Sequence, residues 1–387
     1  MNYLTKPIFE MHEFPEYLAT FGHEVGFVQF PEGQRKNQRP AQNPQVVIKG
    51  RVLPDARLTL FTPWTLSMSG VNRLVAAVTI FFQFRAILKN FAPDIVVSYA
   101  VPTSGWQALN ACRLAQIPFV FRALDVSHKI RPSWFAPLIL MAEKFIYRNS
   151  DWLSANNAAM KKYCESLGAK PEKTSVELPP LHLEHFDVER DEKLRASLGF
   201  ESNSRVFLYM GTFFYFSGLP DLIRKFAEKR LEGDYLLLVG GGDQERELIE
   251  LVKTLRIQKF VVFTGFVDFD KLPSYLSVAD VALNPMQPSL VSNAAIPNKV
   301  IQYLAAGLPV VSTRLDGLQA TFVEGKSIAY ADSPSDVFPL AQQILGNSQE
   351  SNDMSARKGI VKKLFDVQES VTRFEEMLRE VVDSRLQ

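Results

Sequence analysis

Short runs of β-branched or other apolar residues alternate with stretches of helical periodicity along most of the chain. This alternation is typical of α/β domains in which a parallel sheet carries helices on both faces. The first half predicts strands at residues 24–30, 58–61, 94–99, 119–124, 152–155 and 175–178, with helices at 13–20, 71–90, 104–115, 133–147 and 158–166. The second half repeats the pattern, with strands expected at 206–210, 235–239, 261–264, 281–284, 310–312 and 328–330.

A polar segment at 187–191 follows Pro179 and Pro180 and separates the two halves. We therefore predict one Rossmann-like domain over residues 1–186, a second over 187–345, and C-terminal helices over 346–387. A polar stretch at 34–44 reads as an exposed loop. Open parallel sheets bind ligands at the carboxyl ends of their strands, so the cleft between the two domains is the expected ligand site.

Two apolar stretches allow more than one interpretation. Residues 71–88 are interrupted by Arg73, Gln83 and Arg85, so they predict a long buried helix rather than a membrane span. Residues 129–148 are basic and aromatic. Such a helix either packs against the sheet, the interpretation favoured here, or rests on an anionic membrane surface.

Composition excludes several classes of protein. The 387 residues carry 43 basic and 42 acidic side chains, which leaves a formal charge of +1 and no electrostatic footprint for nucleic acid. Cys112 and Cys164 stand in unrelated contexts without a histidine cluster, which argues against a disulfide framework and a zinc site. No signal-peptide pattern opens the sequence. We expect a cytoplasmic protein, with the inner membrane face as a further option.

The most informative segment runs from residue 298 to 313, NKVIQYLAAGLPVVST. It predicts a helix that ends at Gly307 and passes at once into a buried strand. Pro297, Asn298 and Lys299 occupy the start of that helix, where free backbone N–H groups, the helix dipole and a lysine favour a phosphate. A glycine cluster at 240–242 ends an earlier strand and also permits close approach of a ligand.

These residues carry a family resemblance. The segment resembles the donor-site helix of retaining glycosyltransferases of family 4, also called group 1, whose usual form is P-x-K-x-x-E-Y-x-A-x-G-x-P-V-V. The chain matches this form at Pro297, Lys299, Tyr303, Ala305, Gly307, Pro309, Val310 and Val311. The resemblance implies an α/β protein with the GT-B fold, in which two Rossmann-like domains face each other across a cleft and a C-terminal helix crosses back. The first domain would then bind the acceptor and the second the nucleotide sugar.

The resemblance also implies which residues bind the donor, and it shows where this chain departs from the family. The usual glutamate pair is replaced by Ala294 and Gln302, and the usual arginine and lysine of the first phosphate loop by Thr212 and Ser217. Uncharged hydroxyl and amide groups form weaker hydrogen bonds than the charged side chains that they replace. The implied donor-binding residues are Gly211, Thr212, Ser217, Gly240, Phe266, Asn284, Asn298, Lys299 and Gln302.

Two residues of the first half are candidates for the acceptor side. Asp125 and His128 follow the strand at 119–124, at the position where the family carries an aspartate. At a strand's carboxyl end they would face the cleft and orient a hydroxyl. The alternative is structural, since Asp125 also suits the cap of the next helix.

These patterns predict a glycosyltransferase that moves a sugar from a nucleoside diphosphate sugar to a hydroxyl of a glycan or lipid-linked acceptor with retention. Asp125, His128 and Lys299 are its candidate catalytic residues, and it needs no cofactor or metal. The rival prediction is a non-catalytic subunit that binds a nucleotide sugar or a partner, favoured by the substitutions at Thr212, Ser217, Ala294 and Gln302. A nicotinamide dehydrogenase is disfavoured, because no G-x-G-x-x-G follows the opening strand.

Overall fold

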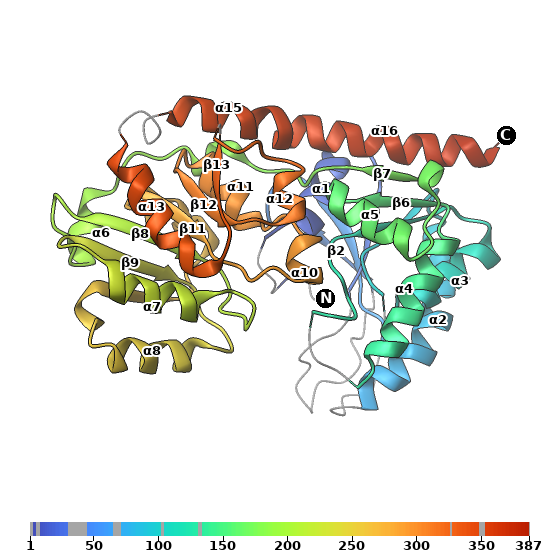
Figure 1. Cartoon of the computed structure of the whole chain (residues 1–387). Coiled ribbons are helices and arrows are strands. Elements are labelled where there is room, and N and C mark those ends of the chain that lie inside the picture. Colours follow the sequence, from blue (N-terminus) through green and yellow to red (C-terminus); the bar gives the residue numbers. More distant parts are fainter. Residues whose placement is uncertain are drawn as a thin grey trace. The chain divides into compact units, whose positions relative to one another are not determined.

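A computed structural model describes residues 3–4, 8–29, 45–64, 71–101, 104–130, 134–325, 327–347 and 353–386. The chain forms two compact units (Figure 1). The first unit comprises Met1–Pro180 and Val367–Gln387, and the second comprises Leu181–Asp366. The loop expected at 34–44 lies outside the described residues.

The second unit is built on a six-stranded parallel sheet with the order β10-β9-β8-β11-β12-β13. Five of these six strands are buried along most of their length, which explains why they appear in the sequence as continuous apolar runs, whereas β10 is buried only at Val261. The strands of this sheet are β8 (Arg205–Met210), β9 (Asp234–Val239), β10 (Val261–Gly265), β11 (Val281–Asn284), β12 (Val310–Thr313) and β13 (Ile328–Ala331). The sheet therefore matches the predicted strands within about two residues at each end.

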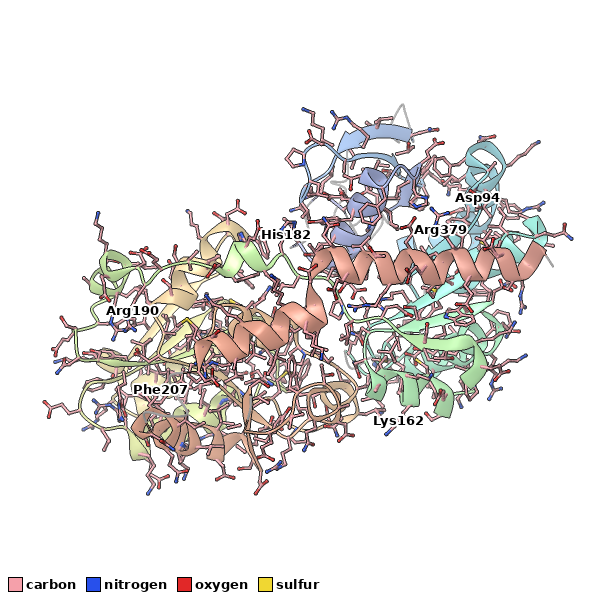
Figure 2. The ribbon with its side chains drawn as sticks, turned by 90° about the horizontal axis from the view of Figure 1, so that it is seen from above. Asp94, Lys162, His182, Arg190, Phe207 and Arg379 are labelled. Atoms are coloured by element: carbon pink, nitrogen blue, oxygen red, sulfur yellow. The ribbon has the colours of Figure 1, made fainter. Side chains whose placement is uncertain are left out.

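Helices cover this sheet and complete its core. Phe207 of β8, labelled in Figure 2, packs edge-on against Phe338, with ring centroids 4.7 Å apart. Phe226 packs on the same ring at 5.0 Å. The helices are α6 (Glu192–Ser197), α7 (Leu219–Lys229), α8 (Glu245–Thr254), α9 (Leu272–Ser277), α10 (Leu290–Asn293), α11 (Asn298–Ala305), α12 (Asp316–Gln319), α13 (Val337–Gly346) and α15 (Met354–Phe365).

The first unit holds two sheets among its described residues. One has the order β1-β3-β2 and the other the order β4-β5-β6-β7. The pair β2–β3 is antiparallel, whereas all other pairs are parallel. The strands are β1 (Val25–Val28), β2 (Gln45–Lys49), β3 (Arg57–Phe61), β4 (Val96–Ser98), β5 (Phe119–Ala123), β6 (Trp152–Ala155) and β7 (Thr174–Val176).

The helices of the first unit are α1 (Glu10–Thr20), α2 (Val71–Phe91), α3 (Gly105–Ala115), α4 (Ala136–Asn149), α5 (Ala158–Ser166) and α16 (Val367–Leu386). The expectation that 71–88 forms a buried helix is wrong in part. Ile80, Phe84 and Leu88 are buried, but Val78 and Phe82 on the same helix are exposed. A helix that covers a sheet buries one face, so an apolar sequence does not make it buried all round.

The last helix belongs to the first unit although its sequence follows the second. Phe374 of α16 stacks on Phe14 of α1 with ring centroids 4.2 Å apart, and Arg385 pairs with Asp151 at 2.7 Å. Arg379, labelled on α16 in Figure 2, pairs with Glu375 of the same helix at 2.7 Å. The preceding helix α15 instead packs on α11 within the second unit. The chain thus returns to its first unit between Asp366 and Val367.

Candidate functional site

The carboxyl ends of β8, β9 and β10 are joined by backbone hydrogen bonds. The Gly211 N–H donates to the Val239 carbonyl and the Gly240 N–H to the Gly265 carbonyl, both at 2.9 Å. Gly240 has φ +128°, and a Cβ there would lie 2.1 Å from the Gly211 carbonyl oxygen. A side chain at Gly240 would therefore clash with the Gly211 backbone, so these two turns lie directly against each other. After β8 the chain continues through β9 and β10 on one side and then forms β11 on the other side of β8, which makes the carboxyl end of β8 a topological switch point.

Lys299 lies at this switch point. It is the second residue of α11, and its side chain is half-buried. The Nζ atom lies 3.9 Å from the centroid of the Tyr209 ring and 3.6 Å from the position that a Cβ of Gly211 would take. Burial lowers the pKa of Lys299 to about 7. The lysine thus places a titratable cation beside the carboxyl end of β8.

Tyr303 fastens α11 to the same strand. Its hydroxyl accepts a hydrogen bond from the Met210 N–H at 2.7 Å and donates to the Met210 carbonyl at 3.3 Å. Met210 directly precedes Gly211, so the helix that carries Lys299 is held in register with the glycine turn. The sequence pattern did not predict these roles of Tyr303 and Tyr209. The one feature that could have indicated the role of Tyr303 is its place in the motif around Lys299.

The two loop residues predicted to contact phosphate lie in different settings. Thr212 continues the Gly211 turn, and its carbonyl accepts a bond from the Tyr209 hydroxyl at 3.1 Å. Ser217 is buried, with its hydroxyl 3.5 Å from the Gln244 side-chain oxygen and next to the start of α7. The following Gly218 has φ +71°, and a Cβ there would lie 1.7 Å from the Pro285 carbonyl. The Ser217 hydroxyl is thus buried between the Gln244 side chain and the Leu219 N–H.

The remaining predicted donor residues differ in exposure. Phe266 is exposed and lies beside the glycine turn, its ring 3.1 Å from where a Cβ of Gly241 would be. Asn298 is exposed and Gln302 half-buried on α11. Asn284, at the end of β11, is buried and donates to the Ser312 hydroxyl at 2.8 Å. Its Oδ1 atom has no hydrogen-bond partner among the described residues.

The two first-unit candidates follow β5. Asp125 is exposed, whereas His128 is buried, and its Nδ1 lies 2.6 Å from a carboxylate oxygen of Glu143 on α4. Glu143 also accepts bonds from the Ser127 N–H at 2.8 Å and the Tyr163 hydroxyl at 3.2 Å. Burial raises the pKa of Glu143, although the bond from His128 acts in the opposite direction. A carboxylate at Nδ1 favours the tautomer with a proton there and leaves Nε2 as an acceptor.

The structure thus brings Gly211, Thr212, Gly240 and Lys299 together at one sheet edge of the second unit, while Asp125 and His128 share one loop of the first. The described residues contain no cluster of His, Cys, Asp or Glu that could hold a metal ion. Within the described part of the chain, every helix is too short or too polar to cross a membrane.

Two family models match the chain and between them cover most of it. Residues 204–347 match the model described as "Glycosyl transferases group 1", and residues 11–177 match "Glycosyl transferase 4-like domain". The first match lies within the second unit and the second match within the first unit, and each covers most of its unit. These are the two α/β halves that the sequence pattern predicts on either side of residues 187–191.

Curated relatives match parts of the chain. It is 33% identical over 133 residues to the lipopolysaccharide core biosynthesis glycosyltransferase LpsE of Rhizobium meliloti, a match that covers 34% of this chain and 36% of that protein. It is 27% identical over 136 residues to the putative teichuronic acid biosynthesis glycosyltransferase TuaH of Bacillus subtilis, which covers 33% of this chain and 32% of that protein. The matches span between about a third and three fifths of the length of such curated relatives.

Solved structures share the fold over a longer span. Sucrose-phosphate synthase from Thermosynechococcus elongatus superposes with a TM-score of 0.77 at 21% identity, covering 97% of this chain and 93% of that one. Anabaena HepE in complex with UDP and glucose superposes with a TM-score of 0.70 at 18% identity, covering 84% and 86% of the two chains. At these identities the similarity establishes the two-unit α/β architecture.

Proposed function

This chain belongs to the group 1, family 4-like glycosyltransferases of GT-B fold, and we propose that its second unit binds a nucleoside diphosphate sugar whose glycosyl group is transferred to an acceptor hydroxyl. The observation that carries the proposal is the position of Lys299. Its ammonium lies beside the Gly211 turn at the switch point of the sheet, where the absence of a glycine side chain lets a diphosphate approach the backbone closely.

The chemistry assigned to Lys299 is stabilisation of the departing diphosphate. Breaking the bond between sugar and phosphate builds negative charge on the leaving group, and a cation already held in place lowers that barrier. Thr212 adds a hydroxyl on the same turn. The Ser217 hydroxyl is buried and bonds to the Gln244 side chain, so Lys299 carries most of the diphosphate contact.

The acceptor side rests on Asp125 and His128. With Nδ1 held by Glu143, His128 presents Nε2 as the atom that can accept a hydroxyl proton. We infer a glycan or lipid-linked acceptor from the lipopolysaccharide and teichuronic acid enzymes that the chain is similar to, and retention of configuration from the family likeness. Both cysteines are free, and we place the reaction in the cytoplasm at the inner membrane face.

A panel of nucleotide sugars tests the proposal. Thermal shift with UDP-, GDP-, ADP- and TDP-sugars should single out one nucleotide, since a ligand at about 100 times its dissociation constant stabilises by about 2.7 kcal/mol. Transfer of radiolabelled sugar from that donor to glycan or glycolipid acceptors should then be measurable. Stabilisation without transfer or hydrolysis would favour the non-catalytic binding subunit. The absence of any shift with all donors would contradict the proposal.

Donor affinity should depend on pH because of Lys299. Its pKa is about 7 in the free protein, and a bound diphosphate favours the charged ammonium and raises that pKa. Binding therefore takes up a proton above pH 7, so affinity is full below pH 7 and falls as the pH rises, by about tenfold between pH 6 and pH 8. Calorimetry with the selected nucleotide sugar measures this directly. A Lys299→Arg variant, which stays charged, should bind with a flat profile; an equally steep profile in that variant would assign the titration elsewhere.

A further inference from the structure

The Lys299 ammonium lies on the face of an aromatic ring and not beside a carboxylate. Its Nζ atom is 3.9 Å from the centroid of the Tyr209 ring. Among the residues that the structure describes, no carboxylate pairs with this ammonium, and burial alone lowers its pKa. A lysine that is largely removed from water usually pairs with a carboxylate, because an unpaired buried charge is costly. The Tyr209 ring therefore occupies the position that a counterion usually takes.

The side chain of Tyr209 is fixed in place. It is 1% exposed in the core of the second unit, and its ring centroid lies 6.0 Å from that of the buried Phe213 ring. Its hydroxyl donates to the Thr212 carbonyl at 3.1 Å. The ring can turn away from Lys299 only by breaking that hydrogen bond and disturbing the packed core.

The lysine is fixed relative to this ring as well. One turn further along α11, the Tyr303 hydroxyl bonds to the backbone N–H and carbonyl of Met210, the residue that follows Tyr209. The next residue is Gly211, where a Cβ would lie 3.6 Å from the Lys299 Nζ atom. The end of β8 therefore holds the ring, the helix and the ammonium in one arrangement beside the Gly211 turn.

Other ionisable groups near α11 do not set the charge of Lys299. Burial raises the pKa of Tyr209 and of Tyr303 well above neutral pH, so both hydroxyls stay uncharged. The ionisable side chains of α15 and of the turn Leu183–Phe186, which pack against α11, do not shift the pKa of Lys299. These side chains are Glu184, His185, Arg357, Lys358, Lys362 and Lys363.

We propose that Tyr209 is a positioning residue for sugar transfer, whose ring face keeps the Lys299 ammonium charged and beside the Gly211 turn until a diphosphate binds. A carboxylate in the same position would also stabilise the ammonium, but it would repel the incoming diphosphate. An aromatic ring has a negative face that attracts a cation, yet it carries no net charge. The ring therefore stabilises the cation without opposing the anion. The proposal deepens the proposed function and rests on it, since it assigns the residue that prepares the diphosphate-binding cation.

Fluorinated phenylalanines test the ring face with little change in its shape. Tyr209→Phe keeps the face and serves as the reference of the series. The same substitution with mono-, di- and trifluorinated phenylalanine withdraws negative charge from the face in steps, so the pKa of Lys299 should fall with each fluorine, by about 0.7 of a pH unit over the series. Competitive acetylation followed by mass spectrometry measures this pKa in the free protein, whether or not the protein binds a nucleotide.

Donor affinity should follow the series only where Lys299 titrates. At about pH 8, affinity for the nucleotide selected by thermal shift should fall about fivefold from Tyr209→Phe to the trifluorinated variant. At about pH 5.5 the difference should nearly vanish, because the ammonium is charged in every variant. Combined with Lys299→Ala, the series should have no effect on affinity. The matched control is the same series at Tyr235 of β9, whose ring packs on Phe200 with centroids 5.2 Å apart, and it should change neither quantity.

The outcomes separate this proposal from the proposed function. An unchanged Lys299 pKa across the series, in variants that keep the parent's melting temperature, would overturn the proposal. A loss of affinity that persists at about pH 5.5, or in the Lys299→Ala background, would assign the effect to the packing of β8 and also overturn it. A falling pKa in a protein that binds no nucleotide would confirm that the ring holds the charged lysine and would count against the proposed function alone.

Discussion

Replacing Lys299 by alanine should lower sugar transfer by about 100-fold, because a cation that faces the departing diphosphate in the transition state contributes a few kcal/mol. The loss should exceed that of most single basic residues, since Thr212 and Ser217 stand where the usual form of the family motif has two cations, and the Ser217 hydroxyl is buried against Gln244. Folding should change little, because the Lys299 ammonium makes one cation–π contact with Tyr209, worth about 1 kcal/mol.

Two comparisons give this prediction its control. Lys253→Ala removes an exposed lysine of α8 that pairs only within its own helix, with Glu250 at 2.8 Å, and should leave transfer unchanged. The companion change Gln302→Glu should strengthen donor binding modestly by restoring a charged acceptor. Transfer by Lys299→Ala within about threefold of the parent would remove Lys299 from the catalytic step, since that loss is far below what a charge stabiliser contributes.

The strands of the second unit were predicted well because most of them are buried on both faces. Such strands appear as unbroken apolar runs, and β11 was predicted residue for residue. The position of Lys299 beside a glycine turn followed from a motif that couples a helix start to a strand end. The strand β2 was missed, since most of its residues are exposed and its antiparallel partner β3 supplies the pairing. A short exposed strand leaves no apolar run to find.

Other features depend on contacts that no local pattern contains. The Tyr303 hydroxyl bonds to Met210, 93 residues away in sequence. The exposed face of α4 could not be predicted either, because periodicity shows which residues share a face of a helix but not which face points outward. Here α4 buries Glu143, Ile146 and Tyr147, whereas Leu138 and Met141 are exposed. The buried carboxylate of Glu143 is satisfied by His128, Ser127 and Tyr163.

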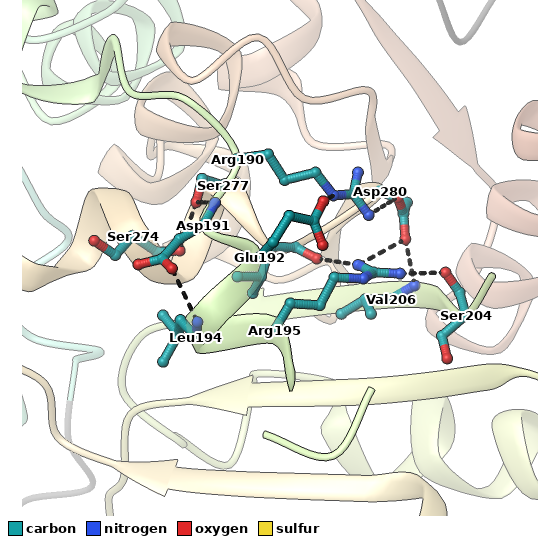
Figure 3. A network of polar contacts seen from close by, with 11 residues as sticks. Arg190, Asp191, Glu192, Leu194, Arg195, Ser204, Val206, Ser274, Ser277 and Asp280 are labelled. Atoms are coloured by element: carbon teal, nitrogen blue, oxygen red, sulfur yellow. Dashed lines mark hydrogen bonds and ion pairs between the residues drawn. The ribbon is translucent and has the colours of Figure 1, made fainter. Parts of the chain in front are cut away.

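A buried arginine at the opposite end of the second unit's sheet supports its fold (Figure 3). Arg195 of α6 is buried and donates to the carbonyls of Val278, at 2.6 Å, and Ser204. Its guanidinium lies 3.5 Å from Asp280, whose other contacts include the Val206 N–H at 2.7 Å. Arg195 thus ties α6 to the amino ends of β8 and β11, while Gly211 and Lys299 lie at the carboxyl edge.

Arg195→Met should therefore destabilise the second unit by about 3 kcal/mol, because it leaves two carbonyls without their donor and removes one of the two cations paired with Asp280. Hydrogen exchange in urea should show earlier opening of β8 peptides and unchanged opening of β5 peptides in the first unit. Nucleotide-sugar affinity at low temperature should stay at the parent's value, since the change lies at the far end of β8. Arg224→Met, which removes an exposed arginine paired with Asp221 at 3.3 Å, should cost under about 0.5 kcal/mol. If the β8 peptides of both variants exchange at the same urea concentration as those of the parent, the Arg195 network adds nothing to the stability of the sheet beside Lys299.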